Sequence, residues 1–307
     1  MRKIEILGLS TIPDIRAGDK LGEIIVHCAE DEVGGIQGKD IVVITSKIVS
    51  KAEDNLAVLG QVKPGKKALS LAKRTGKAAE KIQLIFDSGQ EIVAVLPLKE
   101  LGEKYIMKST RRPAQARRLL EEEACILVTK DKEGRLHTYD GGIDSSNHPS
   151  DTVSLLPPDP DGSARRLRYE IKGLIDKEVA VLIADTEVVP FGSIDLAIGA
   201  SGIETVAKKF GEDDRFGRPK FGGMDVTAYE LTAAAALLFG QTSEGIPVAI
   251  IRGLDYQISE EENVLNTLVA DWHEMRKVVG SAIKATASIG GLKARILYWI
   301  LHHFMRI

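Results

Sequence analysis

The stretch Val179-Ala-Val-Leu-Ile-Ala184, followed at once by Asp185 and Thr186, is the most hydrophobic strand signal in the chain. Such an apolar run predicts a buried strand that ends at Asp185. A carboxylate at the carboxyl end of a buried strand is typical of active sites in α/β-type sheets. An aspartate that caps a helix is the alternative role.

Other strands and helices are expected on both sides of this stretch. Strands are predicted at Ile4–Leu9, Asp40–Ser46, 91–98 and Val248–Arg252, and a hairpin at 125–129 and 136–139. Helical spacing of apolar residues predicts helices at 19–33, 64–85, 163–175 and 225–239. The run 155–162 contains three prolines and is expected to be irregular.

Two segments carry unusual charge patterns. Residues 99–123 are basic and then acidic, which predicts a solvated, charge-paired helix or, alternatively, a basic flap over an anionic substrate. The tail from Asn263 to Ile307 is strongly helical, and its last part is apolar with basic insertions. We expect it to dock on the protein body or on a partner subunit; contact with a membrane surface is the alternative.

The composition excludes several classes of protein. Hydrophobic residues make up 44% and charged residues 28% of the 307 positions, which is typical of a globular protein. The net charge of −3 provides no general positive field for nucleic acid. No signal-peptide core and no run of about 18 apolar residues occurs, so we expect a cytoplasmic protein. Cys28 and Cys125 are expected to be reduced and buried.

Two further motifs gather polar side chains suited to phosphate and metal. Ser46 and Lys47, with Ser50 and Lys51 close behind, follow a buried strand, where lysines and hydroxyls suit phosphate oxygens. The run Gly141-Gly-Ile-Asp144-Ser-Ser-Asn147 offers hard oxygen ligands for Mg²⁺ or Mn²⁺, although an Asx-capped turn explains it equally well. No P-loop motif occurs.

The order of these motifs resembles the coenzyme F420-0:L-glutamate ligase family, or γ-glutamyl ligases, over nearly all of residues 1–260. The proline-rich run and the run 142–147 are the most specific pieces. The matching pieces are Ile12–Ile15, Ser46–Glu53, Gly142–Asn147, Leu155–Ala164, Asp185-Thr186, Leu196–Gly202 and Gly240–Pro247.

The resemblance implies an α+β fold of two intertwined subdomains over residues 1–262, with an added C-terminal helical extension over 263–307. It implies a homodimer that joins L-glutamate to a small-molecule carboxylate, with GTP as co-substrate and two Mg²⁺ or Mn²⁺ ions. A substrate carboxylate would attack the γ-phosphate to give an acyl phosphate, which the glutamate amine then converts to an amide.

The resemblance also implies roles for individual residues. Asp144 and Asp185 would hold one metal ion, Thr186 and Gln241 would lie near the second, and Lys51 would join the two aspartates as catalytic residues. The nucleotide would contact Ile12, Pro13, Asp14, Ile15, Ser46, Lys47, Lys51, Asn147, Gly240, Gln241, Thr242, Ser243, Glu244, Gly245 and Ile246.

One motif departs from the family pattern. After Asp185-Thr186 the family usually has arginines, whereas this chain reads Glu187-Val-Val-Pro-Phe-Gly192. Loss of guanidinium groups would weaken binding of an anionic acceptor, so we expect a divergent member with an altered acceptor. A folate-type γ-glutamyl ligase, or a nucleotide- or phosphate-binding homologue without ligase activity, are the alternatives.

Overall fold

The computed structural model describes residues 3–98, 102, 105–189, 192–293, 295, 296 and 299. The chain divides into a larger unit, Met1–Lys132 with Leu136–Leu268, and a smaller unit, Glu133–Arg135 with Val269–Ile307. The strands are β1 Glu5–Leu9, β2 Ile41–Thr45, β3 Leu56–Val58, β4 Glu91–Pro97, β5 Cys125–Lys130, β6 Leu136–His137, β7 Thr152–Ser154, β8 Ala180–Val189, β9 Gly192–Ser201 and β10 Val248–Arg252. The α-helices described are α1 Leu21–Val33, α2 Ser46–Ala52, α3 Lys66–Thr75, α4 Ala79–Asp87, α6 Pro113–Glu122, α7 Pro160–Ile175, α8 Thr227–Phe239, α9 Val264–Thr267 and α10 Trp272–Ile289.

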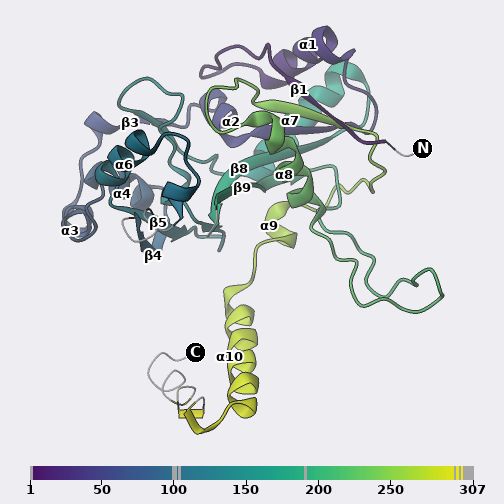
Figure 1. Ribbon diagram of the computed structural model, residues 1–307. Coiled ribbons are helices and arrows are strands. Elements are labelled where there is room, and N and C mark those ends of the chain that lie inside the picture. The colour runs from purple at the N-terminus through teal and green to yellow at the C-terminus, as the bar shows by residue number, and fades with distance from the viewer. Residues whose placement is uncertain are drawn as a thin grey trace. The chain divides into compact units, whose positions relative to one another are not determined.

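The central sheet of the larger unit has the strand order β1-β10-β2-β8-β9 (Figure 1). Only β2 and β8 pair in parallel; the other neighbours are antiparallel. Side chains alternate between the two faces of a strand. One set, including Val42 and Val181, packs with α1 and α7 in the main core, and α8 packs on the sheet as well. The predicted buried strands are therefore fully enclosed.

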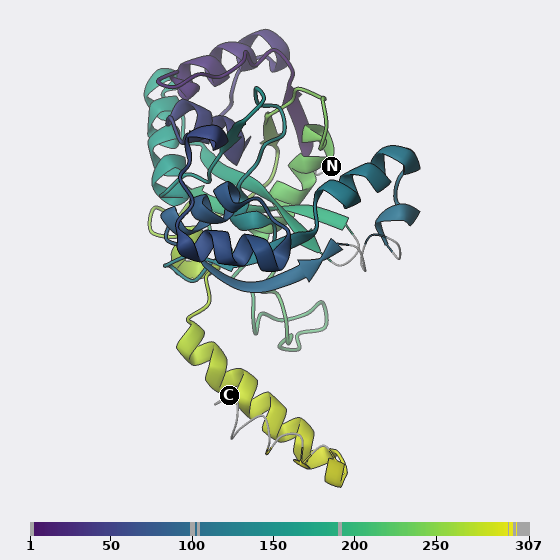
Figure 2. The same cartoon turned by 90° about the vertical axis from the view of Figure 1, so that its left-hand side faces the viewer.

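A second group of elements, α3, α4 and β3 to β7, lies in sequence between α2 and α7, and Figure 2 brings its helices to the front. It contains the sheets β3-β7 and β4-β5-β6 and its own core, which includes Ile82, Ile85 and Leu127. The β5–β6 hairpin confirms the prediction. The single helix predicted over 64–85 is wrong, because Gly76 ends α3 with φ of 73°.

Two predicted boundaries also need correction. The run 155–162 is not irregular throughout, because α7 begins at Pro160, with the Asp159 side chain accepting a hydrogen bond from the Gly162 N–H. Proline is tolerated at the first position of a helix, where its missing N–H has no intrahelical partner. The strand predicted to end at Asp185 continues as β8 to Val189, because β9 pairs with it along this length.

Helix α10 belongs to the smaller unit, and the mixture of sheets and helices confirms the α+β fold with a C-terminal helix. The tail was predicted to begin at residue 263, but α9 belongs to the larger unit. The backbone N–H groups of Val264 and Leu265 donate to the Asp161 carboxylate there. Across the described part of the chain, no helix has the length and hydrophobicity needed to cross a membrane.

The charged segment 99–123 is only partly described. It contains α6, which has no buried residue and confirms a solvated helix over 113–122. Residues 99–101, 103 and 104 lie outside the described residues. A flap over the substrate stays a prediction.

Candidate active site

A pocket of about 400 Å³ opens where the parallel pairing of β2 and β8 ends, at Thr45 and Ala184. Its walls come from five parts of the larger unit: the loop before α1, the start of α2, the 144–147 loop, the β8–β9 hairpin and the loop after α8. All the residues with predicted site roles line it: Ile12, Pro13, Asp14, Ile15, Ser46, Lys47, Lys51, Asp144, Asn147, Asp185, Thr186, Gly240, Gln241, Thr242, Ser243, Glu244, Gly245 and Ile246. The fold thus gathers positions spread over more than 200 residues of sequence.

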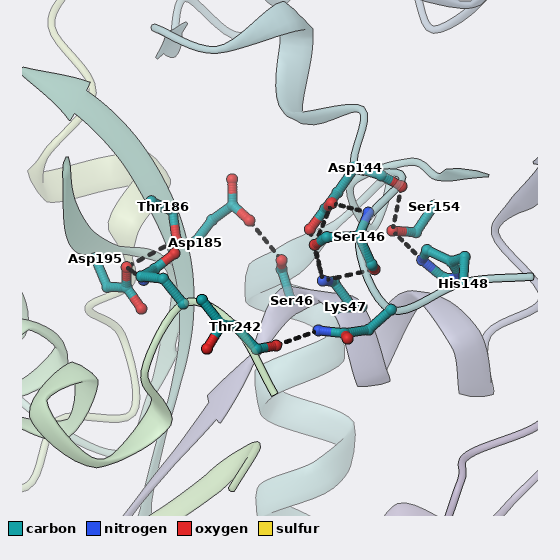
Figure 3. A network of polar contacts seen from close by, with 12 residues as sticks. Ser46, Lys47, Asp144, Ser146, His148, Ser154, Asp185, Thr186, Asp195 and Thr242 are labelled. Carbon is teal, nitrogen blue, oxygen red and sulfur yellow. Dashed lines mark hydrogen bonds and ion pairs between the residues drawn. The ribbon is translucent and has the colours of Figure 1, made fainter. Parts of the chain in front are cut away.

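The first two residues of α2 connect the two aspartates that the sequence predicts as metal ligands (Figure 3). The Ser46 hydroxyl donates to Asp185 Oδ1 at 2.6 Å. Lys47 Nζ lies 2.7 Å from Asp144 Oδ2 and also donates to the Ser146 hydroxyl. Because β2 ends at Thr45 beside Ala184 of β8, α2 begins at the level of Asp185. Backbone pairing therefore sets the position of both contacts.

The loop that carries Asp144 is held in one shape by its backbone. Gly141 and Gly142 have φ of 68° and 71°, which an L side chain rarely adopts, and a Cβ on Gly142 would also meet Leu156 at 2.3 Å. Asp144 then pairs as a β-bridge with Ser154. The turn therefore requires glycine at positions 141 and 142. The same loop places Asp144 at the pocket wall.

Two aspartates of the pocket have shifted pKa values in opposite directions. Burial raises the pKa of Asp144, but Lys47 and the hydrogen bonds from Ser146 outweigh it and hold the pKa below the usual range. Burial raises the pKa of Asp185 to about 7, and the Ser46 hydrogen bond offsets this only in part. Asp185 thus lacks the cationic partner that Asp144 has in Lys47, and a bound cation would supply one.

Asp195 of β9 is a site residue that the sequence analysis missed. It lies opposite Thr186 in the β8–β9 pairing and accepts hydrogen bonds from Thr186 Oγ1 at 2.8 Å and Gln241 Nε2 at 3.1 Å. Its side chain is buried, and burial raises its pKa. A charged residue between Ile194 and Leu196 in an apolar strand was the signal available in the sequence.

Glu32 of α1 was also missed, because it acts from outside the pocket. Its carboxylate accepts four hydrogen bonds, from the backbone N–H and hydroxyl groups of Ser10 and Thr11, at 2.6 to 3.0 Å. Burial raises the pKa of Glu32, but these hydrogen bonds lower it to about 2. The chain continues from them into the pocket-lining segment Ile12–Ile15, so Glu32 fixes where that segment begins.

Lys51 and Asn147, two further residues predicted to contact the nucleotide, place polar side chains at the pocket wall. Lys51 Nζ lies 3.3 Å from Asp14 Oδ1, and its side chain is 13% exposed. The Asn147 amide donates to the Thr242 carbonyl oxygen at 2.9 Å, which joins the 144–147 loop to the loop after α8. Both residues stay predictions as nucleotide contacts.

Glu187, the acid that follows Asp185-Thr186 where the family usually has arginines, does not line the pocket. Glu187 lies within β8, is 7% exposed, and is not among the pocket-lining residues. Its carboxylate accepts hydrogen bonds from the Thr138 N–H and hydroxyl, and lies 3.6 Å from His137 Nδ1. It joins β8 to the second group of elements. Pro190 and Phe191 of the same motif lie outside the described residues.

The donor set suits a hard divalent cation. Asp185, Thr186 and Asp195 lie together in Figure 3, and Gln241 contacts Thr186 and Asp195; all four line the pocket with oxygen atoms, the ligand type that Mg²⁺ and Mn²⁺ prefer. In the described part of the chain, no three His, Cys, Asp or Glu side chains gather closely enough to hold an ion alone. Phosphate and water oxygens would complete the ligand set, as is usual for Mg²⁺ beside a nucleotide.

Comparison with known proteins gives a consistent result. A family model described as F420-0:Gamma-glutamyl ligase matches residues 10–253. A protein of Methanothermobacter thermautotrophicus named coenzyme F420:L-glutamate ligase is 33% identical over 252 residues, covering 81% of this chain and 89% of the relative. Proteins of the same name from Methanopyrus kandleri and Archaeoglobus fulgidus are 34% and 31% identical, covering 81% and 86% of this chain and 86% and 96% of the relatives.

Proposed function

We propose a glutamate ligase function for this chain, which belongs to the F420-0:gamma-glutamyl ligase family. The relatives are named for joining L-glutamate to coenzyme F420, so membership supports an enzyme that joins glutamate to an acceptor. An altered acceptor was expected from the missing arginines, but Glu187 does not line the pocket and the relatives are named for coenzyme F420, so we propose an F420-type deazaflavin carboxylate as the acceptor. We propose further that GTP is the co-substrate and that two Mg²⁺ or Mn²⁺ ions assist. The observation that carries the proposal is the single pocket that collects every predicted site residue.

In this proposal, the two lysines of α2 bind the triphosphate. Lys47 and Lys51 line the same pocket wall and lie one helical turn apart, so both ammonium groups can face one phosphate chain. Lysine acts on phosphate as a compact point charge. The Lys47–Asp144 pair orients the first of them, and Asp14 restrains the second. Partly buried charges hold phosphate more strongly than charges in open water.

The proposed reaction has two steps. An acceptor carboxylate oxygen attacks the γ-phosphorus, the bond from that phosphorus to the bridging oxygen breaks, and GDP leaves, giving an acyl phosphate. The glutamate amine then attacks the acyl carbon, loses a proton, and displaces inorganic phosphate to form the amide. A divalent cation, when bound, neutralises charge on the phosphate oxygens. As the resemblance implies, Asp144 and Asp185 would hold one ion, and Thr186 and Gln241, with Asp195 beside them, would lie near the second.

The proposal is tested by incubating the protein with F420-0, L-glutamate, GTP and Mn²⁺, and measuring glutamylated product by mass spectrometry. Folate run in parallel tests the alternative acceptor. Asp185→Asn should lower turnover by at least about a hundredfold, because an electrostatic contact made in the transition state is commonly worth that much. Asp213→Asn, an exposed aspartate outside the pocket, is the matched control. No product with any acceptor, while GTP still binds, would instead support the non-ligase alternative.

A further inference from the structure

The C-terminal segment from Met275 to Ile307 has a one-sided charge. It contains six Lys or Arg residues and no Asp or Glu, whereas the chain as a whole has a net charge of −3. Trp299 and two other aromatic residues lie in its second half. The match to the family model ends at residue 253, so the proposed ligase function does not account for this segment.

Helix α10 separates its apolar and basic side chains onto different faces. At about 100° per residue, Met275, Val278, Val279, Ala282 and Ile289 fall within one apolar arc. Lys277 and Lys284 lie on the opposite side, with Arg276 near the boundary. The helix is therefore amphipathic, with a basic polar face.

The apolar face of α10 is open to solvent. Val278 is 61% exposed and Ile289 is 88% exposed, and Ala287 is the only buried residue of the helix. Beyond α10, Leu292 and Trp299 are 75% and 56% exposed, with Lys293 and Arg295 between them. The described residues beyond the helix thus add exposed apolar and basic side chains to those of α10. A partner that complements this face would have to be both apolar and negatively charged.

We propose that helix α10, Trp272–Ile289, binds the surface of an anionic phospholipid membrane and lies in the plane of the interface. Such a surface supplies both demands, because acyl chains cover the apolar face while negative headgroups attract the bases. Trp is suited to the boundary between headgroups and acyl chains. A protein partner would have to be acidic and apolar together. Glu274 is the single acid of α10 and is paired with Lys277 at 2.6 Å, and residues 275–307 contain no acid, which favours a uniformly negative surface.

The test uses the full-length protein in flotation assays with phosphatidylcholine vesicles, with or without roughly one third phosphatidylglycerol. We expect binding to the anionic vesicles only, and weaker binding as the salt rises and screens the charges. Lys277→Glu, Lys284→Glu and Lys293→Glu combined should lower the partition coefficient by at least about a hundredfold, since each basic residue near the surface contributes about fivefold.

A matched control reverses three exposed lysines of another region, Lys63→Glu, Lys66→Glu and Lys73→Glu, and should leave the partition coefficient nearly unchanged. Val278→Asp with Val279→Asp should also abolish binding, because this pair lies on the apolar face. Equal binding of the wild-type protein to both kinds of vesicle would overturn the proposal. An equal fall of the partition coefficient in the two triple variants, the one in the tail and the control, would overturn it as well. So would tail-dependent self-association without vesicle binding. Glutamate ligation is measured in a separate assay, so failure of the proposed ligase function and failure of vesicle binding can be told apart.

Discussion

Ser46 and Lys47 lie side by side in the sequence, yet their side chains bind different aspartates, Asp185 and Asp144. The two carboxyls therefore respond to different surroundings, one paired with an ammonium group and the other only with a hydroxyl. The pKa of Asp144 is lowered and that of Asp185 is raised to about 7. The contrast fits a site in which Asp144 orients Lys47 while Asp185 is available to bind a cation.

At Lys51 we predict a loss of nucleotide affinity on truncation. Lys51→Ala removes a charge-assisted contact worth about 1.5–3 kcal/mol, so GTP should bind about 10- to 100-fold more weakly in the presence of Mg²⁺. Calorimetry measures the affinity directly. Lys66→Ala, which removes an exposed lysine outside the pocket, is the control and should bind like wild type. Identical affinities in wild type and Lys51→Ala would remove Lys51 from the nucleotide site.

At His137 we predict a pH-dependent contribution to stability. Burial lowers the pKa of His137, but the carboxylates of Asp131 and Glu187, each 3.6 Å from a ring nitrogen, outweigh it and raise the pKa to about 9. A raised pKa stabilises the fold fully below the unfolded value of about 6.5, and the contribution disappears as the pH rises through about 9.

The test is the difference in unfolding free energy between wild type and His137→Gln as a function of pH. The difference should be about 3 kcal/mol larger at pH 6 than at pH 10. The substitution also disturbs packing, but the packing contribution to the unfolding free energy does not vary with pH. The pH-dependent part of the difference therefore reports the charge of His137. His27→Gln, an exposed histidine of α1, should show a far smaller change. A difference that is flat across this range would contradict the assignment.

At the scale of elements, the sequence identifies the buried strands better than it identifies where they end. The apolar runs of β2 and β10 are recognisable because both faces of these strands are covered. The continuation of β8 beyond Asp185 depends on pairing with β9, a contact between two segments that local pattern does not encode. The pocket residues that the family resemblance implied do come together in the structure. Asp195 was not predicted, because it joins the site only through the pairing of β8 with β9.

The second group of elements is organised around a buried lysine, Lys77, in the turn between α3 and α4. Its ammonium group lies 2.5 Å from Asp140 and 2.6 Å from Glu123, and its side chain is 2% exposed. Asp140 also accepts a hydrogen bond from the Leu127 N–H and immediately precedes the paired glycines of the Asp144 loop. The ion pair thus connects the core of this group to the wall of the pocket.

We predict that Lys77→Met destabilises the protein by about 3–5 kcal/mol, because it leaves Asp140 buried without a counter-charge. Denaturant unfolding measures the loss. Adding Asp140→Asn should recover part of it, since the uncompensated charge is then removed. Lys73→Met, an exposed lysine of α3, is the control and should stay within about 0.5 kcal/mol of wild type. A loss in Lys77→Met no larger than in the control would show that the pair is not structural.

Between β9 and α8 the chain forms an extended arm (Figure 1). Large apolar side chains of this arm are open to water. Phe216 is 85% exposed and Phe221 is 91% exposed, although Phe221 packs edge-on against Phe210 with ring centroids 5.1 Å apart. Exposed aromatic groups of this size favour a protein interface.

We therefore predict that the chain forms a homodimer that uses this arm. Light scattering should give twice the chain mass, and Phe216→Ser with Phe221→Ser should shift the protein to the monomer. Leu119→Ser changes an apolar residue of α6 that is 60% exposed and should leave the dimer intact. A wild-type protein that scatters as a monomer at every concentration would contradict the prediction.

We propose that the pocket beside α2 activates a carboxylate as an acyl phosphate and transfers the acyl group to glutamate. The most direct measurement supplies the acceptor with ¹⁸O in its reacting carboxylate, together with L-glutamate, GTP and Mn²⁺. In the proposed route one carboxylate oxygen leaves with the phosphate, so each amide formed should release one inorganic phosphate that carries a single ¹⁸O. Amide formation that releases only unlabelled phosphate, or GTP cleavage without any amide, would contradict the account.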